Sequence, residues 1–290
     1  MTTTVELATH EWMPDAADAG AAPTAVLVHG VTGWHRTWWR VGPALAARGW
    51  RAVAVDQRGH GLSDKPDTGY GFDEVTADLK ALIEALGLER PVLAGQSYGG
   101  QVALDFAARW PALLSGLVLV DGGFIELSTA PGATWEQTAV DLKPPPLTGM
   151  PRQELLQLMR DYYPTWPESA IEMQMGNFET LPDGTVRPWL TLDRHVQILR
   201  VIWEQRPSEL YARVKTPALI AAADDHGRDG NLERKRVEVA AASAGIEIVR
   251  IRWFQDTAHD IHVERPVELA DWILDALSDG FFAAGEASRA

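Results

Sequence analysis

Short apolar runs that alternate with stretches of helical spacing constrain the fold of this chain more than any other feature. Four runs bounded by turn residues lie in the first 120 positions, at Ala25–His29, Ala52–Val55, Val92–Ala94 and Leu117–Val120. Runs of this length that are apolar at every position are typical of strands buried on both faces of a parallel sheet. The sequence therefore predicts a mostly parallel sheet as the centre of the fold.

The stretches between these runs have the spacing of amphipathic helices. Helices are predicted at Trp38–Arg48, Asp73–Leu86 and Tyr98–Arg109. In the second of these, apolar side chains fall on one face, at Val75, Leu79, Leu82, Ile83 and Leu86. Regular alternation of strand and helix predicts an α/β fold with helices on both faces of the sheet.

This alternation stops after Asp121 and resumes near residue 208. Between Gly122 and Pro207 the sequence has helical fragments broken by prolines and by the turn Pro182-Asp183-Gly184. It then predicts the strands Ala218–Ala223 and Glu247–Ile251, and the helices Leu232–Ala244 and Val267–Leu277. We therefore expect a core domain formed by residues 1–121 and 208–290, with a helical insertion at 122–207.

Composition excludes several classes of function. The 290 residues include no cysteine, which rules out disulfides, thiolate metal sites and a cysteine nucleophile. A net charge of -14 without a local basic block argues against nucleic acid as a partner. The sequence has neither a bilayer-length apolar run nor a visible targeting segment, so we expect a cytoplasmic protein without a membrane partner.

The segment Gly95-Gln96-Ser97-Tyr98-Gly99 carries the clearest chemical signal. It lies between a predicted strand and a predicted helix, which is the context that a G-x-S-x-G nucleophile turn requires. A serine on so tight a turn has strained backbone angles, and side chains at the flanking positions would collide with neighbouring elements. Ser97 is therefore the candidate nucleophile.

Four further segments accompany this turn, each after a predicted strand. They are His29-Gly30-Val31-Thr32-Gly33, the run from Asp56 to Asp64, Asp224-Asp225, and Ala258-His259-Asp260-Ile261-His262. With these motifs the chain resembles the α/β-hydrolase superfamily from Ala25 to Leu277, apart from the insertion. Departures are Ala258, where glycine is usual, and Asp225, where many relatives have proline.

The resemblance implies a role for each motif. Ser97 would be the nucleophile and His259 the base, and the backbone N–H groups of Val31 and Tyr98 would form the oxyanion hole. The insertion would be a helical lid that follows the sixth strand. The order Ser97, Asp224, His259 along the chain is also the order expected for this architecture.

Two assignments stay open at this point. Asp224 is the favoured acid, but the adjacent Asp225 and the earlier Asp121 also follow predicted strands. His262 competes with His259 for the role of base. The implied chemistry is that a neutral imidazole takes the serine proton while a carboxylate orients the ring.

The insertion indicates the kind of substrate. It is rich in large apolar side chains, namely Trp135, Met150, Met159, Trp166, Met173, Met175, Phe178, Trp189 and Trp203. Most are expected to pack the lid, and the rest to form an apolar pocket over Ser97. We therefore expect hydrolysis of a carboxylic ester or lactone of a hydrophobic small molecule, without metal or organic cofactor.

Other functions fit the same motifs. A C–C bond hydrolase or a cofactor-free perhydrolase would use the same three groups. A ligand-binding signalling protein could keep the fold and the triad but release its product slowly. The substrate's identity and the oligomeric state are not indicated by the sequence, because one fold supports many reactions.

Overall fold

A seven-stranded sheet forms the centre of the molecule, which a computed structural model describes at residues 5–15, 22–227, 230 and 232–284. Its strands, in spatial order, are β1 (Thr9–Trp12), β3 (Arg51–Val55), β2 (Thr24–Val28), β4 (Val92–Gln96), β5 (Gly116–Val120), β8 (Ala218–Asp224) and β9 (Val249–Gln255). All neighbours pair in parallel except β1, which is antiparallel to β3. The predicted mostly parallel sheet is confirmed.

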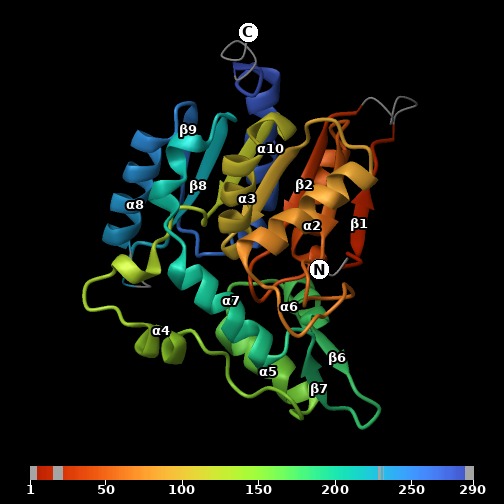
Figure 1. Cartoon of the computed structure of the whole chain (residues 1–290). Helices are drawn as coiled ribbons and strands as arrows, with labels where there is room; N and C mark the ends of the chain where they lie inside the picture. Colours follow the sequence, from red (N-terminus) through yellow and green to blue (C-terminus); the bar gives the residue numbers. More distant parts are fainter. Residues whose placement is uncertain (1–4, 16–21, 228–229, 231, 285–290) are drawn as a thin grey trace.

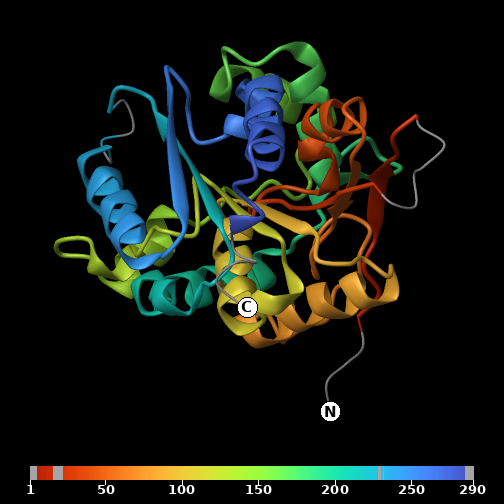
Figure 2. The same ribbon diagram turned by 90° about the horizontal axis from the view of Figure 1, so that it is seen from above.

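Helices cover both faces of this sheet (Figure 2). One face carries α1 (Val41–Ala46) and α10 (Pro266–Ser278), and the other carries α2 (Phe72–Ala85), α3 (Tyr98–Arg109) and α8 (Leu232–Gly245). Successive residues of a strand point to opposite faces. In β2, Val26 and Val28 accordingly pack on the second face, whereas Ala25 and Leu27 pack on the first.

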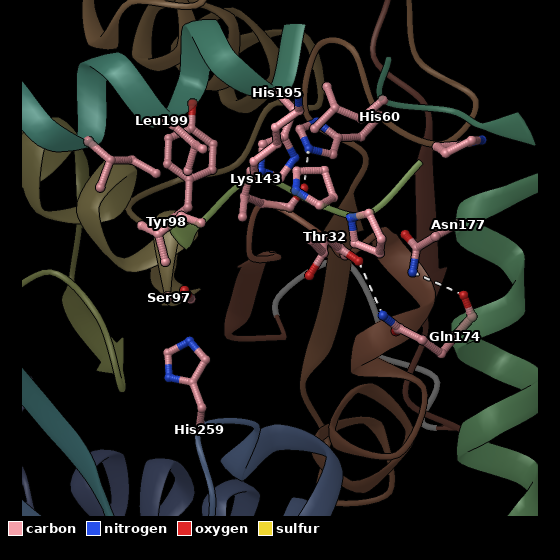
Figure 3. A pocket seen from close by; sticks show the side chains of 18 of the residues that line it. Thr32, His60, Ser97, Tyr98, Lys143, Gln174, Asn177, His195, Leu199 and His259 are labelled. Atoms are coloured by element: carbon pink, nitrogen blue, oxygen red, sulfur yellow. Dashed lines mark hydrogen bonds between the residues drawn. The ribbon is translucent and has the colours of Figure 1, made fainter. Parts of the chain in front are cut away.

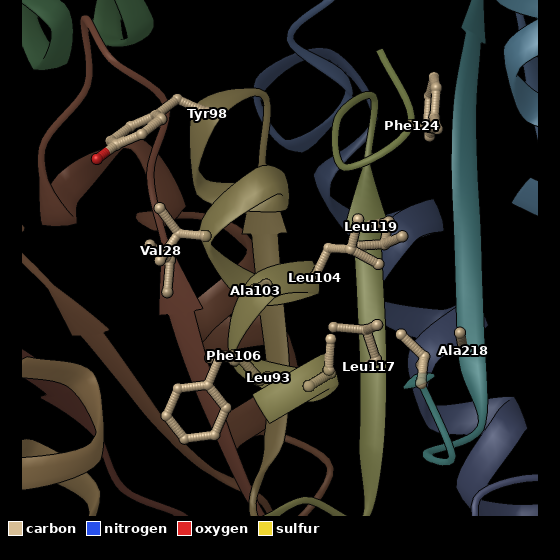
Figure 4. Close-up of a cluster of buried hydrophobic side chains, with 14 of the residues drawn as sticks. Val28, Leu93, Tyr98, Ala103, Leu104, Phe106, Leu117, Leu119, Phe124 and Ala218 are labelled. Carbon is tan, nitrogen blue, oxygen red and sulfur yellow. The ribbon is translucent and has the colours of Figure 1, made fainter. Parts of the chain in front are cut away.

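Helix α3 is the most deeply placed helix, because every residue from Tyr98 to Ala108 is buried. Its side chains Leu104 and Phe106 belong to the same buried cluster as Leu117 and Leu119 of β5 (Figure 4). Full burial of one such side chain contributes about 1.5–3 kcal/mol. The helix that begins directly after Ser97 is thus held rigidly by the core.

The segment between β5 and β8 lies beyond one end of the sheet, at the bottom of Figure 1. It contains the helices α4 (Trp135–Asp141), α5 (Arg152–Tyr162), α6 (Glu168–Gln174) and α7 (Leu192–Glu204). It also contains a short antiparallel hairpin of β6 (Phe178–Thr180) and β7 (Val186–Pro188). No helix among the described residues is long and apolar enough to cross a membrane.

Three details differ from the sequence-based expectations. Strand β1 was not predicted, because Thr9–Trp12 is half-buried at the edge of the sheet and has no apolar run. The insertion includes the hairpin β6–β7 and is therefore not purely helical. It follows the fifth strand of the described chain and not the sixth, since β1 alone precedes β2 there.

Candidate active site

Ser97 lies on a sharp turn between β4 and α3. Its backbone angles, φ 54° and ψ -120°, are outside the regions that a residue with a side chain ordinarily adopts. The amide of Ser97 donates to the carbonyl of Val120 at 3.0 Å, which ties the turn to the end of β5. The strained serine predicted from the motif is therefore present, and it is anchored by the neighbouring strand.

The two glycines that flank this turn are required by close backbone contacts. A Cβ on Gly95 would collide with the carbonyl of Gly99, and a Cβ on Gly99 would collide with the carbonyls of Val28 and His29. All of these neighbours are backbone atoms, so no side-chain rotation could make room. The collisions that the sequence predicts for side chains at these two positions are therefore those that the structure shows.

Asp121 is the carboxylate that contacts His259. The Oδ2 of Asp121 lies 2.7 Å from the Nδ1 of His259, and the Asp121 side chain is fully buried. Its Oδ1 accepts a hydrogen bond from the amide of Ala223 at 2.9 Å. Asp121 directly follows β5, the strand adjacent to the one that carries Ser97, so these three residues gather at one end of the sheet.

The expectation that Asp224 orients His259 is wrong in this structure. Strand β8 extends through Asp224, which pairs with Gln255 of β9, so Asp224 is part of the sheet and not of the loop that follows it. Its Oδ1 accepts from the amide of His226 at 2.9 Å, and its Oδ2 lies 3.7 Å from Arg236. The neighbouring Asp225 accepts from the amide of Gly227 at 2.9 Å. Both carboxylates stabilise the loop that follows β8.

Lys235 of α8 is a member of the site that sequence reasoning missed. Its Nζ lies 2.9 Å from the Oδ2 of Asp121 and 3.1 Å from the carbonyl of Ala223, and the residue is buried. A lysine in a helix is ordinarily a solvent-exposed residue, so the sequence held no signal for this contact. The carboxylate of Asp121 is thus contacted by both Lys235 and His259.

The charges in this group shift its protonation equilibria. Burial opposes ionisation of Asp121, but the hydrogen bond and charge of His259 and the charge of Lys235 hold its pKa below the usual value. Burial lowers the pKa of His259, but the hydrogen bond and charge of Asp121 raise it above 6.5 overall. The charge of Asp260 adds to this increase, and the charge of Lys235 counteracts it.

His259 itself faces an open cavity. Its side chain is 45% exposed and lines the cavity. Figure 3 shows the imidazole beside Ser97, and no direct hydrogen bond joins these two residues of the described chain. In ligand-free enzymes such bonds are often long, and they shorten when a substrate binds.

Gln96 holds the loop that carries His259. Its side-chain amide donates to the carbonyl of His259 at 3.3 Å and to Oδ1 of Asp260 at 3.4 Å. His262, the competing candidate for the base, is buried against Trp38, with ring centroids 4.8 Å apart. Burial lowers the pKa of His262 to about 3, and this residue does not line the cavity. The geometry therefore favours His259.

Val31 and Tyr98 both line the cavity beside Ser97. Tyr98 is the first residue of α3, where a helix leaves its amides without intrahelical acceptors. Neither of the two amides donates to an acceptor within the described residues. Both are thus available to a negatively charged oxygen, as the sequence-based expectation of an oxyanion hole requires.

His29 and His60 support the loop that carries Val31. The Nδ1 of His29 lies 2.7 Å from the carbonyl of Gly30, and its Nε2 accepts from the amide of Gln57 at 3.1 Å. The Nε2 of His60 lies 2.9 Å from the carbonyl of Val31, and its Nδ1 lies 3.0 Å from that of Arg58. These histidines fix loop geometry, and their hydrogen bonds within the described residues go to this loop and its neighbours and not to Ser97.

A cavity of about 1120 Å³ lies over Ser97 and His259, which is larger than most small-molecule sites. Much of its wall comes from the insertion, including Leu158, Phe178, Trp189, Leu190 and Leu199. No group of three or more histidine and acidic side chains in the described residues is arranged to hold a metal ion.

The large apolar residues of the insertion divide between packing and lining. Met159, Phe178 and Trp189 line the cavity. Trp135 and Trp203 instead pack against one another, with ring centroids 6.4 Å apart. Four others pack in or against a second buried cluster, formed by the insertion together with Val263, namely Met150, Trp166, Met173 and Met175. Only part of the predicted aromatic set can therefore contact a substrate.

Comparison with known proteins gives a family match over most of the chain. The sequence matches the protein family described as "Alpha/beta hydrolase family" over residues 25–272. It is 36% identical over 176 residues to 2-(acetamidomethylene)succinate hydrolase from Mesorhizobium japonicum. That match covers 59% of this chain and 60% of the relative, so it spans less than two thirds of the relative's own length.

Solved structures share the fold over nearly all of the chain. A crystal structure of E-2-(acetamidomethylene)succinate hydrolase superposes with a TM-score of 0.77 at 21% identity, covering 96% of this chain and 97% of that one. The enol-lactonase from Burkholderia xenovorans gives a TM-score of 0.69 at 19% identity, with coverage of 96% and 98%. At these identities the likeness shows the fold alone.

Proposed function

This chain belongs to the α/β hydrolase family, and we propose that it is a serine hydrolase that cleaves a carboxylic ester or lactone of a hydrophobic small molecule through an acyl-enzyme. The observation that carries the proposal is the 2.7 Å contact between Asp121 and His259, beside a serine with a strained backbone. A nucleophilic serine needs a neighbouring base, and that base needs an orienting group.

In the first half of the proposed reaction, the Oγ of Ser97 attacks the carbonyl carbon while His259 takes the hydroxyl proton. Asp121 holds the ring with Nδ1 protonated, so Nε2 is free to accept. The C–O bond then breaks, and the alcohol oxygen leaves with the proton from His259. In a lactone this alcohol stays attached to the acyl group.

In the second half, a water molecule attacks the acyl-enzyme and gives its proton to His259. The carboxylic acid leaves, and Ser97 regains its proton. In both halves the negative oxygen of the tetrahedral intermediate would accept from the amides of Val31 and Tyr98. Loss of one such donor typically costs about 2.7 to 4 kcal/mol of transition-state stabilisation.

The substrate class rests on the walls of the cavity. Leu158, Phe178, Trp189 and Leu199 present apolar surface, which suits a hydrophobic acyl or alcohol group. The enol-lactonase that shares this fold provides an analogy for the ester and lactone class. We propose the insertion as the lid over this pocket, and Asp121 in place of Asp224 as the acid. The cytoplasmic location and the absence of other partners stay predictions.

Labelling with a fluorophosphonate probe tests the nucleophile. One label is expected, on Ser97, because only a hydroxyl activated by a base and beside an oxyanion hole reacts at an appreciable rate. The Ser97→Ala variant is the control, and labelling that survives this change would contradict the assignment. His259→Ala should abolish turnover, whereas the matched His262→Ala should retain most of it.

A panel of p-nitrophenyl esters of graded chain length, assayed beside lactones, tests the reaction class. Rapid multiple turnover of at least one ester or lactone is expected. A protein that is labelled at Ser97 but hydrolyses none of them would instead fit a C–C bond hydrolase or perhydrolase. A burst of one product molecule per chain followed by slow release would fit a signalling protein.

A further inference from the structure

His195 places an unused polar atom in the cavity wall. This residue lies on α7 of the insertion, lines the cavity and is only 4% exposed. Its Nε2 is buried and has no hydrogen-bond partner within the described residues. Buried polar groups in proteins are nearly always paired, and an unpaired one costs about 1–3 kcal/mol. The proposed hydrolytic mechanism does not use this atom.

The side chains of His60 and Leu199 do not offer the Nε2 of His195 a partner. His60 is close enough to act on its charge, but both ring nitrogens of His60 face backbone carbonyls, those of Arg58 and Val31. Leu199, one turn further along α7, also lines the cavity and has no polar side-chain group. In the view of Figure 3, His195 and His259 lie on opposite sides of Ser97. Ser97 and His195 line the same cavity, so a ligand held at Ser97 can extend toward His195.

The ring of His195 is uncharged at neutral pH. Burial lowers its pKa to about 4, the charge of His60 adds to this, and the carbonyl of Leu142 counteracts it. A neutral imidazole nitrogen either accepts a hydrogen bond or donates one, depending on the tautomer. It therefore matches an uncharged oxygen group, a hydroxyl or a carbonyl, better than it matches a carboxylate.

We propose that His195 binds a hydroxyl or keto oxygen on the substrate, at a position distant from the bond that is cleaved. This proposal rests on the proposed ester or lactone hydrolysis at Ser97 and narrows its substrate class. The natural substrate would then be an apolar chain or ring with one uncharged oxygen substituent. A site built to pair with such a group discriminates strongly against an analogue that lacks it.

Matched pairs of esters test this proposal. We would compare p-nitrophenyl esters of several chain lengths, each made with a terminal methyl, hydroxyl, keto or carboxylate group. At one chain length the hydroxyl or keto ester should exceed its methyl partner in kcat/KM by about 10-fold, the value of one hydrogen bond. His195→Phe should remove this preference, so that the ratio of kcat/KM between the paired esters falls to about 1.

Two further variants separate hydrogen bonding from shape. His195→Gln keeps a donor and an acceptor and should retain part of the preference, which a purely structural role for the ring would not produce. His226→Phe changes an exposed histidine outside the cavity and should behave as the parent. Equal loss of activity toward every ester in His195→Phe and His195→Gln would contradict the proposal.

The test does not depend on turnover. Dissociation constants of the same esters can be measured with Ser97→Ala and with Ser97→Ala combined with His195→Phe. A hydroxyl or keto preference that appears only when His195 is present supports the proposal, even if the hydrolysis proposed above fails. Equal binding of both members of every pair, or a preference for the carboxylate esters, would overturn the proposal and leave the proposed hydrolysis intact.

Discussion

Lys235 and His259 meet at a single atom, the Oδ2 of Asp121, at 2.9 and 2.7 Å. The buried carboxylate therefore lies between two groups that can carry positive charge. The charge of Lys235 stabilises the ionised carboxylate and disfavours a proton on His259. Asp260 on the same loop raises the pKa of His259, and the charge of His259 in turn adds to the lowering of the pKa of His262 on the following helix.

Removal of the Lys235 charge should shift the acid limb of the kcat/KM profile to higher pH. His259 must be neutral to accept the serine proton, so activity rises as pH increases through its pKa. Since Lys235 lowers that pKa, Lys235→Met should raise it and shift the acid limb of kcat/KM to higher pH. In the parent this limb should lie above pH 6.5. Assays of kcat/KM from pH 5 to 9 would measure the shift.

The control for this prediction is Lys215→Met. Lys215 makes an exposed ion pair with Glu247 and does not line the cavity. Its profile should coincide with that of the parent. A shift of the acid limb of kcat/KM toward lower pH in Lys235→Met would contradict the proposed influence of the lysine on His259. Melting temperatures of both variants would identify any loss of folding.

The acid can be identified by a pair of isosteric changes. Asp121→Asn removes the charge that orients His259 and should lower kcat by about 10⁴-fold with the fold intact. Asp224→Asn should change kcat by less than about 10-fold, because that carboxylate contacts His226 and Arg236 and not His259. The measurement is steady-state kinetics with the best ester. The reverse pattern would restore Asp224 as the acid.

The selectivity of the pocket should depend on one insertion tryptophan and not on another. Trp189 lines the cavity, so Trp189→Ala should shift the preference between short and long esters by roughly 10 to 200-fold. Trp135→Ala is the matched control, because Trp135 packs on Trp203 and lies outside the cavity wall. If both variants keep the parental chain-length preference, the core domain and not the insertion selects the substrate.

A methyl group at Gly99 should destabilise the whole core. Its Cβ would collide with the backbone carbonyls of Val28 and His29, which cannot move aside. Such overpacking costs about 1–3 kcal/mol or more in the free energy of unfolding. Gly71→Ala is the control, since its Cβ would meet only the flexible end of Glu74. Urea denaturation of both variants should show the larger loss at Gly99.

The core strands could be predicted because they are buried on both faces. Five of the seven strands of the main sheet were predicted from apolar runs, and the predicted strand Glu247–Ile251 overlaps β9 in part. Strand β1 was not predicted, because its sequence Thr-His-Glu-Trp lies half-buried at the sheet edge. The hairpin β6–β7 was also missed, since each of its strands has only three residues. The turn Pro182-Asp183-Gly184 between them was visible as a break but not as a hairpin.

The site was predictable only where one local motif defines a residue. Ser97 and its glycines follow from the steric demands of a single turn. The identity of the acid does not follow from a local motif, because Asp121 and Asp224 both lie at the carboxyl ends of strands. The choice between them depends on which of the two side chains reaches His259 in the folded chain. Lys235 contacts the acid from a helix 114 positions further along the chain, and no local pattern encodes such a contact.

The position of Asp121 also determines where the insertion can be exchanged. Asp121 is followed at once by Gly122, whose Cβ would collide with the backbone of Ser97, and Phe124 is buried against the core. These residues are therefore packed as part of the core that supports Ser97, although they precede the helices of the insertion. A chimaera that receives a relative's insertion should therefore be joined after Phe124. A junction at residue 122 would replace residues that pack on Ser97 and the core together with the insertion.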